Sequence, residues 1–588
     1  MPSRLRAIVR RALPSVAAAQ FPALVQLAAL FQLAALVQLA EPAELAAQDA
    51  PADLLIINGR IVDGTGAAWF YGDLVIRGDR IARIAPRGVL TGIVARDTID
   101  ATGMVVAPGF IDIQGQSNFA LLYGDSRLVS KVSQGITSEI LGEGSTPAPL
   151  NARNLAANAN AQQQRFAEPH GFGNWLADIE TRTMSVNIGS FVGGSTIRAY
   201  GMRARAGAAD SAALAEMRGA LERAMQDGAF GMATALIYPP GVFANTAELT
   251  AVSQAMRPYG GLYVTHMRSE GDQLLEAVDE AIAIGRDAGV PVEIYHLKAG
   301  GRRNWPKGPE SIARIAAARA QGLDVQANVY PYTAGGTGLT SCLPPAAQED
   351  NRLFQRLADP AERARIRAEI ERPTSAWENL CELGGIDNVL IARLSVDSLR
   401  RYGGQRLSQI AAARGTDWIE AAFTLIAAER SRVETIYFLM SEENVALNLQ
   451  QPWIKIGTDA GGVTPSANAG LVHPRSYGTF PRILGRYVRD EQVIPLEDAI
   501  RKMTSATARR LGIANRGVLA EGMMADVVVF DPATVGDRAT FEQPHQLSVG
   551  VTATIVNGVP VWRGGAHTGA KPGQILRGPG ATDGSARH

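Results

Sequence analysis

Three residues, His266, His296 and Asp459, stand where side chains can do hydrolytic chemistry. Each ends a short apolar run typical of a β-strand, and one strand–helix unit separates the two histidines. Imidazoles at adjacent strand tips can share a zinc ion, which keeps one position open for water. A carboxylate at another tip can take a proton from that water and pass it to a leaving amine. The pattern indicates metal-dependent hydrolysis, and the alternatives are structural hydrogen bonds for the histidines and an Asx-turn at Asp459.

The elements that would position these residues alternate between strands and helices. Amphipathic helices are predicted at Asp210–Gln226, Asp272–Ala288 and Ser311–Ala320. Eight such units indicate an α/β fold, the (β/α)8 TIM-type barrel, whose reactive groups gather at the carboxyl ends of the strands. The alternative is a doubly wound open sheet, which the lack of a Gly-x-Gly-x-x-Gly turn after the first strand disfavours. The predicted strands are Val105–Ile113, Ile136–Leu141, Val186–Val192, Phe230–Ile237, Leu262–Thr265, Val290–Tyr295, Val325–Val329 and Ile454–Thr458.

Both ends of the chain carry short strand patterns with turn residues. Asn58-Gly59 predicts a two-residue hairpin turn near the N-terminus, and Asn557-Gly558 predicts another near the C-terminus. The economical arrangement is one small β-sandwich domain formed by both chain ends, in addition to the barrel.

The chain is divided accordingly into a leader, a barrel and a two-part β-sandwich. The predicted ranges are 1–50 for the leader, 51–107 and 513–588 for the β-sandwich with a tail, and 108–512 for the barrel. An insertion at about 340–452 separates the last two strands, where one helix would suffice. It is either a lid or specificity element, or a structural or oligomer-forming excursion. Its predicted elements are helices at Asp359–Ile370 and Trp418–Ala428 and a strand at Val433–Met440.

The leader has the order of a secretory signal, with arginines followed by an Ala/Leu/Val-rich run from about Leu13 to Ala40. Glutamines recur in this run every six residues. They disfavour a membrane span because each amide would need a partner in hydrocarbon. We expect an exported protein, periplasmic or secreted, with no membrane span in the mature chain. The alternative is a cytoplasmic protein with a low-complexity leader.

Charge and cysteine content narrow the classes of partner and of metal site. The 57 basic and 57 acidic residues balance, so we expect a small-molecule or peptide partner and no nucleic acid, and leave a homo-oligomer open. Cys342 and Cys381 allow one disulfide, but we expect two unpaired, partly buried thiols. Neither stands in a Cys-x-x-Cys or Cys/His cluster, so a metal site must use nitrogen and oxygen ligands.

Longer stretches of the chain resemble the amidohydrolase superfamily and, within it, the N-acyl-D-amino-acid deacylase (D-aminoacylase) family. The resemblance extends from about residue 53 to residue 576, with several motifs in the same order. The matching stretches are Pro108-Gly-Phe-Ile-Asp-Ile, Thr265-His-Met-Arg-Ser-Glu-Gly-Asp, His296-Leu-Lys-Ala, Val329-Tyr-Pro-Tyr-Thr-Ala-Gly, Gly457-Thr-Asp-Ala, His473-Pro-Arg-Ser-Tyr-Gly-Thr-Phe, Met503-Thr-Ser-Ala-Thr-Ala-Arg-Arg-Leu-Gly and Gly522-Met-Met-Ala-Asp-Val-Val-Val-Phe-Asp.

The resemblance implies a zinc ion held by His266 and His296, with Asp459 as general base and acid in amide hydrolysis. The superfamily normally carries His-x-His at the end of the first strand, where this chain has Gln114 and Gln116. A glutamine amide is a poor zinc ligand because it is uncharged, so we expect one ion rather than two. The two glutamines are expected to hydrogen-bond the water, the substrate or Asp459.

The second strand departs from the family as well, which has a metal-binding cysteine in a Gly-Asn-Cys-Gly stretch. Leu141-Gly-Glu-Gly-Ser stands in that region, one residue shorter. Glu143 there would supply a third, anionic ligand and complete a zinc site of two histidines and one carboxylate. The alternative is that Glu143 caps a turn.

The resemblance also implies that the substrate carboxylate meets Arg475, Lys298 and Tyr330. An arginine suits this ligand because its guanidinium donates two parallel hydrogen bonds to a carboxylate. The alternatives are a surface salt bridge for Arg475 and simple packing for the tyrosine. Gly336 stands where the family often has serine, so one polar contact to substrate is lost or moved to Thr337.

The sequence therefore predicts an enzyme that hydrolyses an N-acyl or related amide bond next to a carboxylate. A second hypothesis keeps the chemistry but changes the substrate to a cyclic amide, a dipeptide or another N-acyl compound. A third is a non-catalytic barrel that has lost its metal chemistry, for which Gln114 and Gln116 are the best support.

Overall fold

A ring of parallel strands forms the centre of the structure, in which each strand position pairs with the next along the chain. The computed structural model describes residues 51–156, 159–372, 376–466 and 470–582, so the predicted leader lies outside the described residues. The third strand position is divided in two by Phe191. The strands are β6 (Phe110–Asp112), β7 (Ile136–Leu141), β8 (Asn187–Ser190), β9 (Val192–Gly193), β10 (Gly231–Ala235), β11 (Leu262–His266), β12 (Val292–Ile294), β13 (Val325–Val329) and β18 (Ile454–Ile456).

The ring closes between its first and last strands, just beyond β6 and β18. Gly115 and Ala460 form a parallel bridge. The Asp459 amide donates a hydrogen bond to the Gln114 carbonyl at 2.8 Å. The predicted barrel is confirmed, and its closure sets Asp459 beside the glutamines of the first strand.

Helices cover the outside of the barrel, as the amphipathic patterns predict. The Asp210 side chain caps α7 (Ser211–Gln226) by accepting from the Ala213 amide, and α9 (Leu274–Ala288) ends at Gly289, which adopts the left-handed conformation that favours glycine. The third predicted helix is α10 (Lys307–Ala320). The other helices around the barrel are α2 (Asn118–Tyr123), α3 (Val129–Val132), α4 (Ala161–Phe166), α5 (Gly171–Thr181), α6 (Gly194–Met202), α8 (Thr246–Ser253), α16 (Glu442–Leu449), α17 (Arg475–Arg482), α18 (Leu496–Met503) and α19 (Ser505–Leu511). Among the described residues, no helix is long and apolar enough to cross a membrane.

The predicted first barrel strand, Val105–Ile113, is wrong as one element. Its first half is β5 (Val105–Pro108), which belongs to the terminal β-sheet, and only β6 joins the barrel. The break falls at Gly109, where a Cβ atom would lie 2.2 Å from Thr137 Cγ2. The close approach of β7 at this point requires glycine and lets the chain pass from the sheet into the barrel.

A fully buried lysine fixes the closure of the barrel. The Lys131 ammonium group lies 2.7 Å from Asp112 Oδ2 and 3.2 Å from Glu139 Oε1. It also donates to Thr458 Oγ1 at 2.8 Å and to the Ala460 carbonyl at 2.7 Å. These partners come from β6, β7 and the segment after β18, so one cation ties together the strands that present the predicted site.

Both chain ends build one β-sheet of nine strands, which confirms that they form a common β unit. The β5 strand joins the two ends, because it pairs with β1 on one side and β19 on the other. The sheet encloses its own apolar cluster, which includes Leu54, Ile76 and Val527. The remaining strands are β1 (Ala52–Ile61), β2 (Phe70–Arg77), β3 (Arg80–Pro86), β4 (Ala95–Asp100), β19 (Val527–Phe530), β20 (Val551–Val556), β21 (Val559–Arg563) and β22 (Ala566–His567).

Of the two predicted Asn-Gly turns, one is confirmed and one is wrong. Asn557-Gly558 connects β20 to β21, and both residues have positive φ. Asn58-Gly59 instead lies inside the continuous strand β1, at a shift in its register with β2. The backbone N–H of Asn58 donates to Asp73 Oδ1 of β2 at 2.8 Å. Asn58-Gly59 is therefore a local irregularity within β1, and the strand continues on both sides of it.

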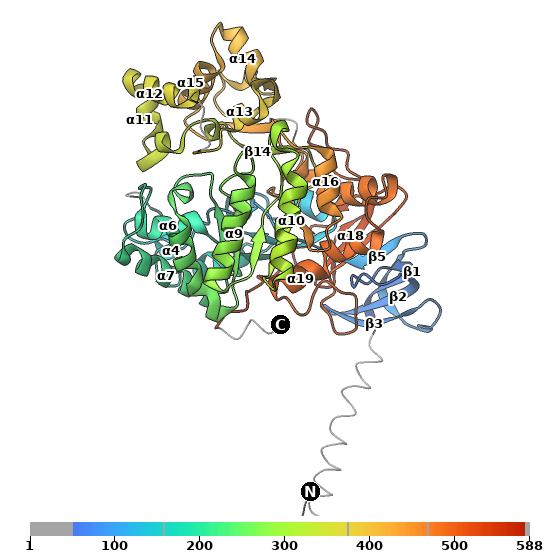
Figure 1. Cartoon of the computed structure of the whole chain (residues 1–588). Helices are drawn as coiled ribbons and strands as arrows, with labels where there is room; N and C mark the ends of the chain where they lie inside the picture. Colours follow the sequence, from blue (N-terminus) through green and yellow to red (C-terminus); the bar gives the residue numbers. More distant parts are fainter. Residues whose placement is uncertain (1–50, 157–158, 373–375, 467–469, 583–588) are drawn as a thin grey trace, which may run out of the picture. The chain divides into compact units, whose positions relative to one another are not determined.

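The insertion forms a separate cluster of helices on an antiparallel sheet (yellow and orange in Figure 1). The predicted helices correspond to α12 and α15 and the predicted strand to β17, all three confirmed. Its sheet begins earlier than predicted, at β14, before residue 340. Its elements are β14 (Ala334–Gly338), α11 (Leu353–Ala358), α12 (Pro360–Glu371), α13 (Leu380–Gly384), β15 (Val389–Arg393), β16 (Gln405–Arg406), α14 (Leu407–Arg414), α15 (Trp418–Glu429) and β17 (Glu434–Phe438).

The expectation of two unpaired thiols is wrong. Cys342 and Cys381 form a disulfide, with their Cα atoms 5.1 Å apart. The two cysteines are separated by 39 positions in the sequence, and only the packing of the insertion brings them together. Both lie in the buried core of the insertion, where the bond closes a long loop.

Replacing Lys131 by methionine should destabilise the protein strongly. The change leaves Asp112 and Glu139 buried without their cation, and breaking a buried ion pair in this way typically costs about 3–5 kcal/mol. Urea unfolding measures the loss. The matched control is Lys307→Met at a partly exposed site, where we expect a change within about 0.5 kcal/mol. Equal effects of the two substitutions would contradict the role assigned to Lys131.

Candidate metal centre

Three predicted metal ligands come together at the carboxyl ends of barrel strands. His266 is the last residue of β11, His296 lies two residues beyond β12, and Glu143 lies two residues beyond β7. One Glu143 oxygen, Oε1, lies 3.1 Å from His296 Nε2 and 3.4 Å from His266 Nδ1. One ligand atom from each residue lies within 4.8 Å of the others, a spacing that can hold a metal ion. All three side chains are buried.

The chemistry of this cluster fits a zinc ion. Two imidazoles and one carboxylate are a ligand set that zinc uses in hydrolases, with a further position left for water. His266 Nε2 is buried and has no hydrogen-bond partner among the described residues. Burial raises the pKa of Glu143, but hydrogen bonds with His266 and His296 outweigh it and hold that pKa well below its ordinary value. The carboxylate is therefore charged and available to a cation.

A second carboxylate, Glu270, contacts His296 at Nδ1, the ring nitrogen on the side away from Glu143. Glu270 Oε1 lies 2.8 Å from His296 Nδ1 and 2.5 Å from Lys298 Nζ, and Lys298 Nζ lies 2.7 Å from His296 Nδ1. Carboxylates commonly orient metal-binding histidines through the ring nitrogen that faces away from the metal. Burial and the charge of Lys298 lower the pKa of His296, but contacts with Glu270 and Glu143 raise it by more. The net effect raises the pKa of His296 to about 9. The ring therefore lies in a strongly negative environment that favours a cation.

Glu270 is a site residue for which the sequence predicted no role. It stands inside the motif that begins at Thr265, four residues after His266. An acidic residue one turn beyond a strand-tip histidine is the pattern that would have suggested it. Lys298, predicted to meet the substrate, lines the cavity and is also in contact with Glu270 and His296.

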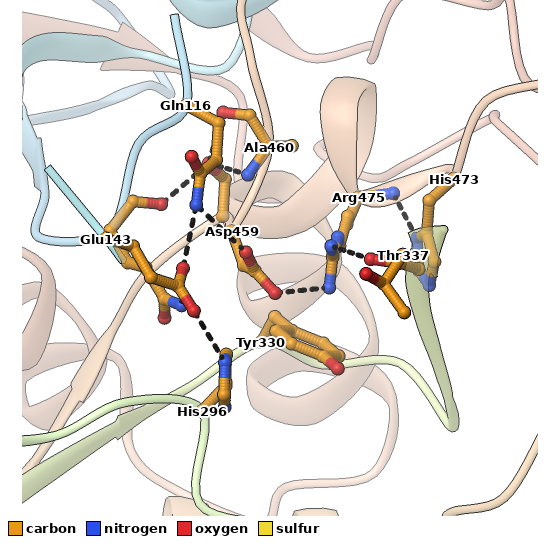
Figure 2. A network of polar contacts seen from close by, with 12 residues as sticks. Gln116, Glu143, His296, Tyr330, Thr337, Asp459, Ala460, His473 and Arg475 are labelled. Carbon is orange, nitrogen blue, oxygen red and sulfur yellow. Dashed lines mark hydrogen bonds and ion pairs between the residues drawn. The ribbon is translucent and has the colours of Figure 1, made fainter. Parts of the chain in front are cut away.

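Asp459 faces the cluster from the end of β18 (Figure 2). Its Oδ2 atom lies 2.6 Å from Arg475 Nη1, and its Oδ1 atom accepts from Gln116 Nε2 at 3.5 Å. Burial raises the pKa of Asp459, and the nearby charge of Glu143 raises it further, against the opposing effect of Arg475. Asp459 and His296 both have positive φ, a strained conformation that is held where the surrounding structure fixes the side chain.

The two glutamines of the first strand both contact Glu143. Gln114 and Gln116 both donate to Glu143 Oε2, each at 2.7 Å (Figure 2 shows the Gln116 contact). Gln116 lines the cavity, whereas Gln114 is only 1% exposed. Of the predicted partners of these amides, Asp459 is contacted by Gln116, and both amides contact the predicted metal ligand Glu143.

Arg475 and Tyr330 form a cationic corner of the cavity. The guanidinium carbon of Arg475 lies 4.7 Å from the centre of the Tyr330 ring, and Nη2 donates to the Gly336 carbonyl at 3.3 Å. Arg475 Nε is buried without a hydrogen-bond partner among the described residues, so a donor is left for a ligand. Tyr332, in contrast, binds Asp537 and packs against Arg482, which supports a packing role.

The missing serine side chain at Gly336 leaves room beside this corner. A Cβ atom there would lie 3.6 Å from Arg475 Nη2, an ordinary contact distance. Thr337, the predicted replacement, lines the cavity, and its hydroxyl accepts from the Tyr238 hydroxyl at 2.8 Å.

The insertion closes one side of a cavity of about 1310 Å³ above the cluster. Glu378 Oε2 accepts hydrogen bonds from Ser269 Oγ and from the Glu270 and Gly271 amides at 2.7–2.8 Å. This carboxylate anchors the insertion to the loop that carries Glu270. The insertion residues that line the cavity include Leu380, Leu383, Arg393, Arg432 and Glu434.

A closed parallel barrel with imidazoles and carboxylates at its strand tips, and a β unit from both chain ends, defines the class of the amidohydrolases. The Amidohydrolase family profile matches residues 397–562. A D-aminoacylase from Alcaligenes xylosoxydans xylosoxydans is 36% identical over 536 residues, which cover 90% of this chain and 98% of the relative. An N-acyl-D-glutamate deacylase from the same organism is 35% identical, with 89% and 96% coverage.

A solved structure extends this similarity to three dimensions. The N-acyl-D-glutamate deacylase of Bordetella bronchiseptica, complexed with zinc and a phosphonate inhibitor, has a TM-score of 0.74 and 33% identity, covering 90% of this chain and 100% of the other. The chain belongs to the D-aminoacylase family of the amidohydrolases.

Proposed function

We propose that the chain hydrolyses the amide bond of N-acyl amino acids with one zinc ion held by Glu143, His266 and His296. The observation that carries this proposal is that these three ligands approach one another and that the largely buried carboxylate Asp459 lines the same large cavity. The relatives support the class of reaction, a metal-dependent hydrolysis of carbon–nitrogen bonds other than peptide bonds. A relative complexed with zinc supports the choice of metal.

Asp459 is the proton carrier of the proposed reaction. A zinc ion at the cluster would act as a Lewis acid and lower the pKa of water. Asp459 takes a proton from the attacking water and gives it to the amine nitrogen as the carbon–nitrogen bond breaks. The products are a carboxylic acid and a free amino acid, so no further reactant is needed. The raised pKa of Asp459 suits a group that must both accept and release a proton.

Arg475 and Tyr330 are proposed to bind the substrate carboxylate. Arg475 has an unpaired buried Nε donor and a fixed orientation through Asp459 and the Gly336 carbonyl. Lys298 adds positive charge to the same wall of the cavity, while its direct contacts support an additional role in holding His296. The insertion, proposed to span about residues 340–452, sets selectivity through the side chains that it places on the cavity wall.

The Asp459→Asn variant should lose turnover by about 10²–10⁴-fold, the usual contribution of a general acid–base group. Its zinc content should stay near that of the wild type, because Asp459 is outside the proposed ligand set. The matched control is Asp324→Asn, since Asp324 precedes β13 at the opposite end of the barrel and binds Arg510. Turnover by Asp459→Asn at the wild-type rate would overturn the assignment.

A substrate panel tests the proposed class directly. We expect N-acyl-D-amino acids to be hydrolysed faster than their L-enantiomers, because the relatives named above act on D-substrates. We also expect the free acids to exceed the corresponding carboxamides by about 10–100-fold in kcat/KM, since hydrogen bonds to charged groups contribute about 1.5–3 kcal/mol. Arg475→Met should remove most of that difference. A preference for cyclic amides, dipeptides or L-substrates would replace the deacylase assignment by the second hypothesis.

We also propose that the protein is exported and that residues 1–50 are the leader. Two observations support export: the arginine-then-apolar order of the leader and the disulfide Cys342–Cys381, a bond typical of oxidising compartments. N-terminal sequencing of the protein from fractionated cells is the test. A mature start beyond Ala40 in the exported fraction is expected, and an intact start in the cytoplasmic fraction would contradict export.

A further inference from the structure

The glutamine pair of the first strand makes an unusual contact for amides next to a metal site. Gln114 Nε2 and Gln116 Nε2 each donate to the same atom, Glu143 Oε2, at 2.7 Å. A carboxylate oxygen has two lone pairs in its plane, so two donors saturate it. The other oxygen, Oε1, is the one that faces His266 and His296. The two oxygens of Glu143 therefore have different functions: Oε2 accepts from the glutamine side chains, and Oε1 faces the two histidines.

The direction of both amides follows from charge. An ionised carboxylate has lone pairs but no hydrogen, so it accepts hydrogen bonds and donates none. Each glutamine must then turn its NH2 group, and not its oxygen, towards Oε2. Amide NH2 groups carry partial positive charge but no lone pair for a metal. They therefore place positive charge next to Oε2, as a cation would, but they cannot themselves bind a cation.

The charges around the cluster favour this arrangement over a second metal ion. Three carboxylates with little exposure to solvent surround the cluster: Glu143, Glu270 and Asp459. Two cations pair with the last two of them, Lys298 with Glu270 and Arg475 with Asp459. Histidines that bind a metal are neutral, so these five charged groups together with one divalent ion carry a single net positive charge. A second divalent ion would leave three positive charges in a buried site, and burying uncompensated charge is strongly unfavourable.

The backbone holds both glutamines rigidly at this position. The backbone N–H of Gln114 donates to Asp112 Oδ1, and the backbone carbonyl of Gln114 accepts from the backbone N–H of Asp459. The backbone N–H of Gln116 donates to the Ala460 carbonyl at 3.0 Å. Gly115 between them is required, because a Cβ atom would lie 2.0 Å from Glu139 Oε1. These contacts belong to the barrel closure that Lys131 fixes. The protein alone thus holds the side-chain amides of Gln114 and Gln116 in place beside Glu143, without the help of a metal ion.

We propose that Gln114 and Gln116 are positioning residues that hold Glu143 as a ligand through its Oε1 oxygen and keep a second cation from binding to Oε2. The inference rests on the proposed metal centre. It assigns to the glutamines a function at the metal ligand and not at the substrate. It also explains why a site without the His-x-His pair retains a complete set of three ligands for one ion.

The test is zinc binding by the purified full-length protein, measured by competition with a chromophoric chelator and by metal analysis. Wild type should bind one zinc ion per chain. The double variant Gln114→Met, Gln116→Met keeps the side-chain length but removes both donors, and its zinc dissociation constant should rise by about 10–100-fold, the usual effect of losing groups that orient a metal ligand. The double variant Gln114→His, Gln116→His should bind a second zinc ion per chain.

A matched control separates loss of a buried glutamine from loss of the contact with Glu143. Gln134 is fully buried and binds the Ser130 and Ser476 carbonyls, away from the cluster. Gln134→Met should leave zinc affinity unchanged, and Glu143→Gln should give the full loss of affinity against which the other variants are compared. If the double methionine variant does not fold, the single variants Gln114→Met and Gln116→Met give the same comparison.

A dissociation constant of the methionine variants within twofold of wild type would overturn the proposal, as would two zinc ions of similar affinity in the wild type. These outcomes are independent of the substrate. A protein whose zinc affinity depends on the glutamines but that hydrolyses no N-acyl amino acid would contradict the proposed function and leave this inference standing. Full activity on N-acyl amino acids, with a zinc affinity that does not depend on the glutamines, would support the proposed function and contradict this inference.

Discussion

The need to neutralise buried charge organises the structure around its reactive end. Three carboxylates with little exposure to solvent, Glu143, Glu270 and Asp459, follow β7, β11 and β18 at the carboxyl end of the barrel. Each has a cationic or N–H partner: Lys298 beside Glu270, Arg475 beside Asp459, and the amides of Gln114 and Gln116 beside Glu143. The remaining deficit of positive charge lies between Glu143 and the two histidines. The zinc ion that we propose there would supply positive charge beside Glu143, so the fold and the proposed chemistry share one electrostatic requirement.

Buried charge must also be neutralised where the barrel closes between its first and last strands. Lys131 lies between Asp112 and Glu139 with no exposure to solvent, and its other contacts reach Thr458 and the Ala460 carbonyl. The residue between these last two is Asp459. A structural cation thus fixes the backbone that carries the proposed proton carrier. The glutamines of the first strand are fixed by the same closure, which links the stability of the barrel to the geometry of the metal ligands.

Much of this arrangement is predictable from sequence because strand tips are easy to recognise. Apolar runs that end in His266, His296 and Asp459 imply that the three side chains meet in a barrel. Glu143 follows from its position at the end of the second strand. Glu270 and Lys298 are different, because their role depends on how a loop folds back onto His296, and no local pattern specifies that path. The disulfide is likewise invisible in sequence, since the packing of the insertion alone brings Cys342 to Cys381.

The Asn58-Gly59 pair shows a second limit of sequence patterns. Its local preference for a turn is real, and Asn58 does have positive φ. Pairing with β2 and β5 nevertheless keeps the strand continuous, because the hydrogen bonds of the sheet outweigh a two-residue preference. The glutamines show the opposite case, in which a departure from a family pattern is informative: the sequence shows that His-x-His is lost, and the structure shows which contact takes its place.

The central claim is that one zinc ion binds between Glu143, His266 and His296. Anomalous diffraction at the zinc edge from crystals of the zinc-loaded protein tests it most directly. The account predicts a single anomalous peak per chain, bonded to one oxygen of Glu143 and to one nitrogen of each histidine. A peak at another site, or a second peak of similar height beside Gln114 and Gln116, would contradict it.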